Sequence, residues 1–110
     1  MKLSKPIVIG IGDSQKTISE INIKKEDFTA RVIVEAEKEF LLSGGVFTKG
    51  EMESTRAYLG YVAAKIIDCK PEDLMKLTGT EYIKITNMIK GFFDGSDLET
   101  LMEILSGKSE

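Results

Sequence analysis

The sequence contains no histidine and has a single cysteine, Cys69, among its 110 residues. Without histidine, the commonest general base and the usual imidazole partner of a nucleophilic cysteine are both missing. One cysteine can form neither an internal disulfide nor a cysteine metal cluster. We therefore expect no enzyme activity and no catalytic, cofactor-binding or metal-ligating residues.

Long apolar runs and basic clusters are also absent. No apolar stretch approaches the ~20 residues that cross a bilayer, and the first residues lead into only a short apolar run at residues 7–11, so we expect neither a membrane helix nor a signal peptide. The net charge is -3 and the pI is near 5.1. Because lysines alternate with acidic residues, we expect no nucleic-acid partner. The acidic balance remains compatible with a protein–protein adaptor in a reducing cytoplasm.

The glycines do not complete a phosphate-binding motif. Gly45 and Gly50 have the spacing of a P-loop, but Glu51 stands where the phosphate-binding lysine is required. Gly10 and Gly12 lack the third glycine of a dinucleotide fingerprint, and a hairpin turn explains them better.

The N-terminal segment has the pattern of a β-hairpin. Residues 7–11 are β-branched apart from Gly10, and residues 17–23 alternate between polar and apolar side chains. The turn-forming group "GDSQ" separates the two runs, which predicts strands at about 3–11 and 16–23. Pro6 has no N–H and suits an edge or the start of a strand.

From Glu26 onward, apolar residues recur at helical spacing. This pattern predicts four to five short amphipathic helices, at about 26–42, 50–68, 71–77, 80–93 and 97–105. We expect the first helix to end where Gly44 or Gly45 takes a left-handed conformation. Capping boxes are expected for the pairs Thr48–Glu51, Thr78–Glu81 and Ser96–Glu99.

These elements predict an α+β fold that is mostly α. The length favours one domain over residues 1–110, with the hairpin in 1–24, the helical part in 25–105 and a frayed tail in 106–110.

Small and flexible apolar side chains mark a candidate interaction surface. Ala57, Gly60 and Ala64 form a stripe of small residues, which suits close packing against a helix of the same chain or of another subunit. Methionines in the C-terminal helices either fill gaps in the core or adapt to a partner surface. The candidate surface for a partner or for self-association comprises Ala57, Gly60, Ala64, Met75, Met88 and Phe93.

The order of elements resembles that of the small tail assembly chaperones of contractile-tailed bacteriophages and prophages. A "KPI" entry into the hairpin is followed by "INIKKEDF", a middle helix and "PEDLMKLTGTEYIKITNMIKGFF". In that family a proline–acid–leucine helix precedes a short polar step and a second helix that ends in an aromatic residue. The matching positions are Pro71, Asp73, Leu74, Leu77, Glu81, Ile85, Ile89 and Phe92. The resemblance covers residues 5–95, and this chain departs from the pattern by delaying the acid of the polar step to Glu81.

The resemblance implies a non-enzymatic protein of the host bacterial cytoplasm. Such proteins bind apolar helical segments of the tape measure protein during tail morphogenesis, help to recruit tail tube subunits and are absent from the mature virion. No cofactor, nucleic acid or membrane is implied, and a homo-oligomer stays open. Two alternatives also stay open: a structural virion component such as a tube or completion protein, and a small acidic regulatory or adaptor domain.

Overall fold

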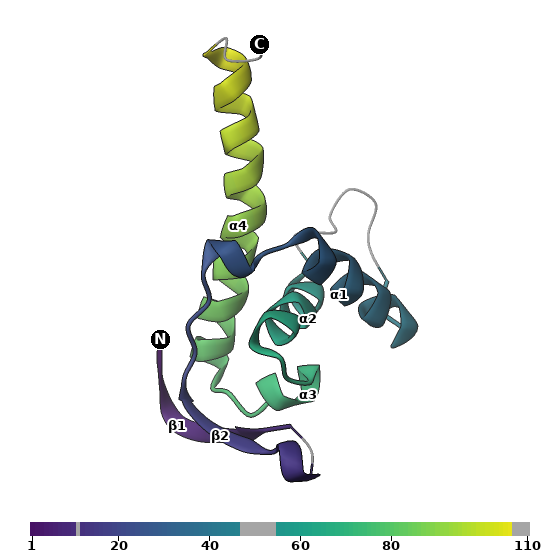
Figure 1. Cartoon of the computed structure of the whole chain (residues 1–110), viewed down its shortest axis with the longest axis vertical. Coiled ribbons are helices and arrows are strands. Elements are labelled where there is room, and N and C mark those ends of the chain that lie inside the picture. The colour runs from purple at the N-terminus through teal and green to yellow at the C-terminus, as the bar shows by residue number, and fades with distance from the viewer. Residues whose placement is uncertain (11, 47–54, 107–110) are drawn as a thin grey trace.

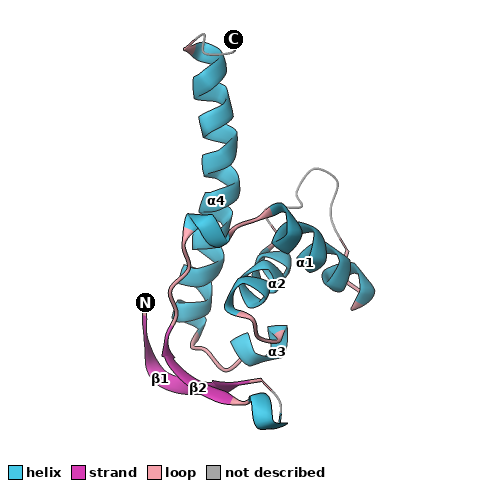
Figure 2. Cartoon of the chain, in the orientation of Figure 1, coloured by secondary structure: helices cyan, strands magenta, loops and turns pink. Residues whose placement is uncertain are grey.

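The computed structural model of the chain describes residues 1–10, 12–46 and 55–106, with the backbone alone over 96–104. In these residues a two-stranded antiparallel sheet precedes four α-helices, so the predicted α+β, mostly α fold is confirmed (Figures 1 and 2). In chain order the elements are β1 (Lys2–Ile9), the 3₁₀ turn η1 (Gly12–Ser14), β2 (Lys16–Glu20), the 3₁₀ turn η2 (Lys25–Asp27), α1 (Ala30–Leu42), α2 (Arg56–Ile67), α3 (Pro71–Leu74) and α4 (Gly79–Leu105).

The predicted hairpin is present, but its strands end at Ile9 and Glu20, before the predicted residues 11 and 23, and it contains an irregularity. Ile7 lies opposite Ile18, whereas Lys2 lies opposite Glu20, so the register shifts between these two pairs. Pro6 falls within the shifted segment, where a residue without an N–H is tolerated because the regular ladder is interrupted there.

Helix α1 begins later than the predicted residue 26. Thr29 is its N-cap and accepts a hydrogen bond from the Val32 N–H at 3.3 Å. The preceding residues form η2 instead, where the Asp27 carboxylate accepts the Lys24 N–H at 3.0 Å. Two successive local caps therefore divide the segment that the apolar spacing had predicted as a single helix.

The end of α1 is a Schellman motif, and the left-handed glycine predicted for this helix end is Gly44. Gly44 has a φ of +96°, its N–H donates to the Leu41 carbonyl at 3.1 Å, and the Gly45 N–H donates to the Phe40 carbonyl at 2.9 Å. These bonds satisfy two carbonyls that the helix end would leave without partners.

We expect Gly44→Ala to lower the free energy of unfolding by about 1–2 kcal/mol, because an L side chain at positive φ is strained. An added Cβ at Gly44 would meet no atom within 4 Å, so any loss reports backbone strain alone. Gly79→Ala is the matched control: its Cβ also meets nothing within 4 Å, and the site is the first residue of a helix. Urea denaturation of both variants checks this, and equal midpoints for the two would contradict it.

Helix α4 corrects the largest error in the predicted boundaries. The helices expected at 80–93 and 97–105 are one continuous helix, Gly79–Leu105, so no helix begins at the predicted Ser96–Glu99 capping box. A glycine inside a helix costs only about 1 kcal/mol, and this stretch contains no proline to remove a backbone donor. Lys90 and Asp94, one turn apart, form an ion pair at 2.7 Å. This pair spans residue 93, where the first of the two helices was predicted to end.

The end of α3 and the start of α2 also differ from the predicted boundaries. Helix α3 ends at Leu74 and not at the predicted residue 77. The amides of Lys76 and Leu77 bond three residues back, at 3.2 Å each, so the backbone tightens into turns after Leu74. Helix α2 begins at Arg56, after Thr55 in an extended conformation, and not at the predicted residue 50. The predicted Thr48–Glu51 box lies outside the described residues.

Helix α2 lies at the centre of the helical part and contacts α1, α3 and α4. Half of it is buried: Tyr58, Leu59, Gly60, Val62, Ala63 and Ala64. Phe40 of α1 packs edge-on against Tyr58, with ring centroids 6.0 Å apart. A helix that is apolar on several sides needs neighbours on several sides, and here the other three helices supply them. Figure 1 shows the C-terminal part of α4 extending beyond this cluster.

Candidate functional site

An apolar pocket lies where α2, α3 and α4 meet. Its volume is about 250 Å³, and we call it the α2–α3–α4 pocket. It is lined by Ala57, Gly60 and Tyr61 of α2, by Pro71, Glu72 and Met75 at α3, and by Tyr82 of α4. Glu72 is the only lining residue with a charged side chain. The pocket is smaller than the ~300–1,000 Å³ typical of sites for drug-sized ligands, so it suits a single side chain better than a cofactor.

The wall from α2 follows from helical spacing. Ala57, Gly60 and Tyr61 are separated by three and four residues, which places them on one side of the helix. The core residues Leu59 and Val62 lie on another side of α2 and are at most 1% exposed. One helix can therefore serve the core and the pocket with different residues.

Gly60 allows α4 to approach closely. A Cβ added at Gly60 would lie 2.2 Å from the Tyr82 hydroxyl oxygen and 3.1 Å from its Cζ. Any larger residue would therefore displace the tyrosine ring that forms one side of the pocket. The small-residue stripe serves contact within the chain at this position.

Two tyrosines set the polarity of the pocket wall. The Tyr61 and Ser43 hydroxyls lie 2.8 Å apart in a hydrogen bond, which ties this wall to the end of α1. Burial raises the pKa of Tyr82 above its ordinary value of 10.0, although nearby Arg56 partly opposes the shift. The Tyr82 hydroxyl therefore stays protonated at neutral pH, and within the described part of the chain it makes no hydrogen bond.

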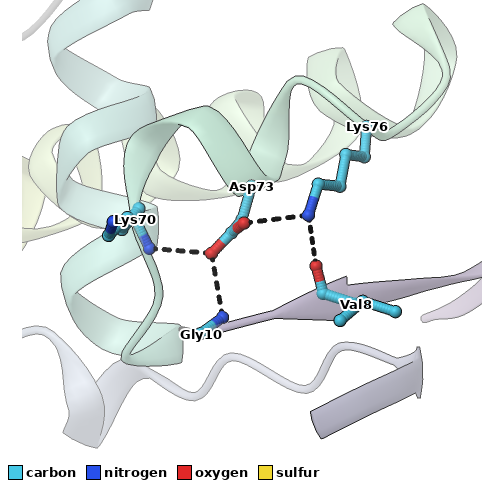
Figure 3. A network of polar contacts seen from close by, with 5 residues as sticks. All are labelled: Val8, Gly10, Lys70, Asp73 and Lys76. Carbon is cyan, nitrogen blue, oxygen red and sulfur yellow. Dashed lines mark hydrogen bonds and ion pairs between the residues drawn. The ribbon is translucent and has the colours of Figure 1, made fainter. Parts of the chain in front are cut away.

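A buried carboxylate fixes α3, which supplies the third wall (Figure 3). Asp73 is 6% exposed, and its Oδ2 accepts two backbone N–H groups at 3.2 Å, one from Gly10 and one from Lys70. Its Oδ1 pairs with the Lys76 Nζ at 3.1 Å. The Lys76 ammonium also donates to the Val8 carbonyl of β1. We call these residues the Asp73 clamp, because they hold α3 against the end of β1.

The clamp favours the ionised form of Asp73. Burial of the carboxyl raises its pKa, but the hydrogen bonds from Lys76, Gly10 and Lys70 together outweigh burial, so the pKa lies below its ordinary value of 3.8. Asp73 is therefore charged at neutral pH, and its interactions are charge-assisted.

Glu81, at the start of α4, also accepts hydrogen bonds both from its own helix start and from the hairpin. Its Oε1 accepts the Thr78 N–H at 3.1 Å, and the Glu81 N–H donates to the Thr78 hydroxyl at 3.2 Å, which confirms the predicted capping box. The other oxygen of Glu81 accepts the Ser4 N–H of β1 at 2.6 Å. Hydrogen bonds from Ser4 and Thr78 lower the pKa of Glu81 below its ordinary value of 4.5. Both helices that follow α2 are thus tied to β1 by an acid in their first turn.

A second cavity of about 310 Å³ lies on the other side of Pro71, and it is more polar. Glu39 and Lys65, which line it, already form an ion pair with each other. Its Cys69 is a poor candidate nucleophile: burial, with repulsion from Asp73 and Asp68, raises the pKa of the thiol to about 12. We therefore place the candidate site in the apolar pocket and not in this cavity.

The structure divides the residues of the predicted interaction surface. Ala57, Gly60 and Met75 converge on the α2–α3–α4 pocket. Ala64 is 1% exposed and belongs to the core. Met88 is 37% exposed on α4 and does not line the pocket.

Phe93, the last residue of the predicted surface, is half-buried. Its ring packs edge-on against Phe28, with centroids 4.8 Å apart. It therefore contributes to packing between α4 and the segment before α1, away from the pocket.

The sequence reasoning missed the remaining pocket residues, Tyr61, Pro71, Glu72 and Tyr82. Pro71 was expected only as a position of the family resemblance, and Glu72 and Tyr82 had no predicted role at the surface. The one available signal was Gly60, because a glycine inside an apolar helix often marks a close approach by a bulky neighbour. Nothing in the sequence indicated which side chain that neighbour would be.

Two further properties concern ions and membranes. Across residues 1–10, 12–46 and 55–106, no group of three or more acidic, cysteine or histidine side chains is placed to hold a metal ion. None of the helices in these ranges combines the length and the apolar character that a membrane span requires.

The fold and the pocket define a small α+β protein with an apolar pocket between three of its helices. Comparison with protein-family models, with curated proteins and with solved structures finds no match for this chain.

Proposed function

We propose that this protein is a non-enzymatic tail assembly chaperone of a phage or prophage, and that it holds apolar helical segments of the tape measure protein during tail morphogenesis. The observation that carries the proposal is the α2–α3–α4 pocket, where Ala57, Gly60 and Met75 of the predicted surface lie together. The resemblance in residues 5–95 supplies the class of partner.

The pocket suits a holding function because it is apolar and open to a partner. Met75 at its edge is 64% exposed, and methionine adapts to differently shaped apolar partners. A helix that lays its apolar side into a groove needs such a surface and no nucleophile. A pocket of this size would anchor one point of an interface, since stable interfaces bury about 1,200–2,000 Å² in total.

The proposed role also accounts for the hydrogen bonds that Asp73 and Glu81 make to the hairpin. A pocket between three helices keeps its shape only when those helices are fixed to one another. Asp73 and Glu81 tie α3 and α4 to β1 through hydrogen bonds to Gly10 and Ser4. We propose that the hairpin holds α3 and α4 in place, so that the pocket keeps its shape before a partner binds. In this role the protein acts in the bacterial cytoplasm and is absent from the mature virion.

The direct test is a pull-down with the tape measure protein from the same genome, after co-expression and again with the two purified proteins. We expect a complex at micromolar concentration and a larger soluble fraction of the tape measure protein when both are co-expressed. If both proteins purify separately and form no complex at that concentration, the proposal is wrong. Mass spectrometry of purified particles separates a chaperone, which should be missing, from a structural tail component.

A further inference from the structure

The α2–α3–α4 pocket carries one carboxylate, Glu72, that has no side-chain partner in the part of the chain that the structure describes. Glu72 lines the pocket and is exposed. Among the residues that the structure describes, it forms no ion pair and its side chain makes no hydrogen bond. Its neighbour Asp73, by contrast, is fully engaged in the clamp. The pocket therefore combines a small apolar space with a free negative charge at its edge.

We propose that this pocket binds one large apolar side chain of a partner helix, and that Glu72 pairs with a lysine or arginine one turn away in that same helix. The proposal rests on the proposed function, and it names the chemistry that this chain would recognise in its partner. A volume of about 250 Å³, below that of most ligand sites, favours a single large side chain such as leucine, methionine or phenylalanine.

The partner's charge follows from complementarity. A free carboxylate beside an apolar anchor site favours a cation and disfavours an anion on the partner. In a helix, residues three or four apart lie on the same side. A cation at that distance from the anchor can therefore reach Glu72 while the anchor fills the pocket, which a cation two residues away cannot do.

Two strongly exposed apolar side chains of α1 lie outside both cavities. Val34 and Leu42 of α1 are 63% and 77% exposed, but neither lines the pocket or the polar cavity beside it. A well-packed pocket is where an anchor side chain contributes most to binding. The same apolar side chain laid on the outer surface of α1 would remain partly hydrated.

The test uses synthetic helical peptides of about 15 residues, the length at which an alanine-rich helix begins to be stable. The reference peptide has one leucine and a lysine four residues later. Three others replace the leucine by alanine, replace the lysine by glutamate, or move the lysine to two residues after the leucine. Fluorescence anisotropy gives the Kd of each. We expect the alanine peptide to bind about thirtyfold more weakly, as for loss of an interface anchor, and the two charge variants about two- to fivefold more weakly.

Protein variants locate the site. Glu72→Lys should reverse the preference between the lysine and glutamate peptides, whereas Glu26→Lys, the same charge change at an exposed residue of η2, should not. Met75→Ser should weaken binding of the leucine peptide. Val34→Ser is its matched control, because Met75 and Val34 are 64% and 63% exposed, and it should leave binding unchanged.

Several results would overturn the inference. These are equal affinity for the leucine and alanine peptides, no binding of the reference peptide up to millimolar concentration, or equal effects of Glu72→Lys and Glu26→Lys. Light scattering adds another: if the protein self-associates and Met75→Ser abolishes this, the pocket is filled by a second copy. Binding of the tape measure protein that ignores the pocket variants removes this inference and leaves the chaperone function standing. If the peptides bind as expected but the tape measure protein does not bind, the proposed function is wrong and the pocket chemistry stands.

Discussion

Replacing Asp73 by alanine is expected to lower the free energy of unfolding by about 1.5–3 kcal/mol, the range for hydrogen bonds to a charged group. The change leaves the Gly10 and Lys70 amides without their acceptor and removes the ion pair with Lys76. The loss should stay below the ~3–5 kcal/mol of a broken, fully buried ion pair, because Lys76 is 48% exposed and water can replace part of the interaction. Urea denaturation followed by circular dichroism measures the change.

The same variant should alter the dependence of stability on pH. The pKa of Asp73 in the folded protein lies below its ordinary value of 3.8, so its stabilisation is present above that value and disappears as the pH falls through the folded pKa. Wild type should therefore lose stability more steeply than Asp73→Ala below about pH 4. A smaller slope should remain in the variant, because the pKa of Glu81 is also lowered.

Asp13→Ala is the control for both measurements. Asp13 is an exposed acid in η1, and within the described residues it makes no hydrogen bond through its side chain. We expect its unfolding free energy to stay within about 0.5 kcal/mol of wild type, as for most surface substitutions. If Asp73→Ala proves as stable as Asp13→Ala, then the clamp does not stabilise the fold.

Gly60→Leu is expected to cost up to about 3 kcal/mol, the upper part of the range for overpacking. Even the first added carbon would lie 2.2 Å from the Tyr82 hydroxyl oxygen. Rotation of the ring about its own axis cannot relieve this contact, because the hydroxyl oxygen and Cζ, which would lie 2.2 and 3.1 Å from the new carbon, both lie on that axis. Tyr82 must therefore leave its position, and the pocket changes shape with it. The expected results are a lower denaturation midpoint and weaker binding of the leucine peptide.

Smaller changes at the same position separate a clash from helix propensity. In a helix free of contacts, glycine to alanine stabilises by about 1 kcal/mol. We expect that gain at Gly91 of α4, where an added Cβ meets nothing within 4 Å, and no gain at Gly60. Combining Gly60→Ala with Tyr82→Phe removes the closest atom and should recover part of the loss. A Gly60→Ala variant as stabilised as Gly91→Ala would show that Tyr82 moves aside without cost.

Local chemistry made much of the fold predictable. The hairpin followed from alternation and the "GDSQ" turn, the end of α1 from its glycine pair, and the start of α4 from the Thr78–Glu81 capping box. Each of these signals acts between residues a few positions apart. The same reasoning wrongly predicted a break near Gly95, because it gave a weak helix breaker the weight of a strong one.

The candidate site was only half predictable. The stripe of small residues in α2 pointed to a close approach, and it brought Ala57 and Gly60 into the predicted surface. The same stripe included Ala64, which the structure places in the core. Helical spacing alone cannot tell these positions apart, because the neighbours of α2 cover several of its sides.

By itself, the sequence determined the class of fold, the hairpin and most helix ends, since backbone preferences and first-turn caps depend on neighbouring residues. The tertiary structure decided how these elements meet. Asp73 bonds to Gly10, which is 63 residues away, and Tyr82 packs onto Gly60. It also decided that Glu72 lines an apolar pocket, with no side-chain partner among the described residues, while Asp73 beside it is buried in a clamp. Two adjacent acids in one helix turn look alike in sequence, and only the packing of distant elements gives them different environments.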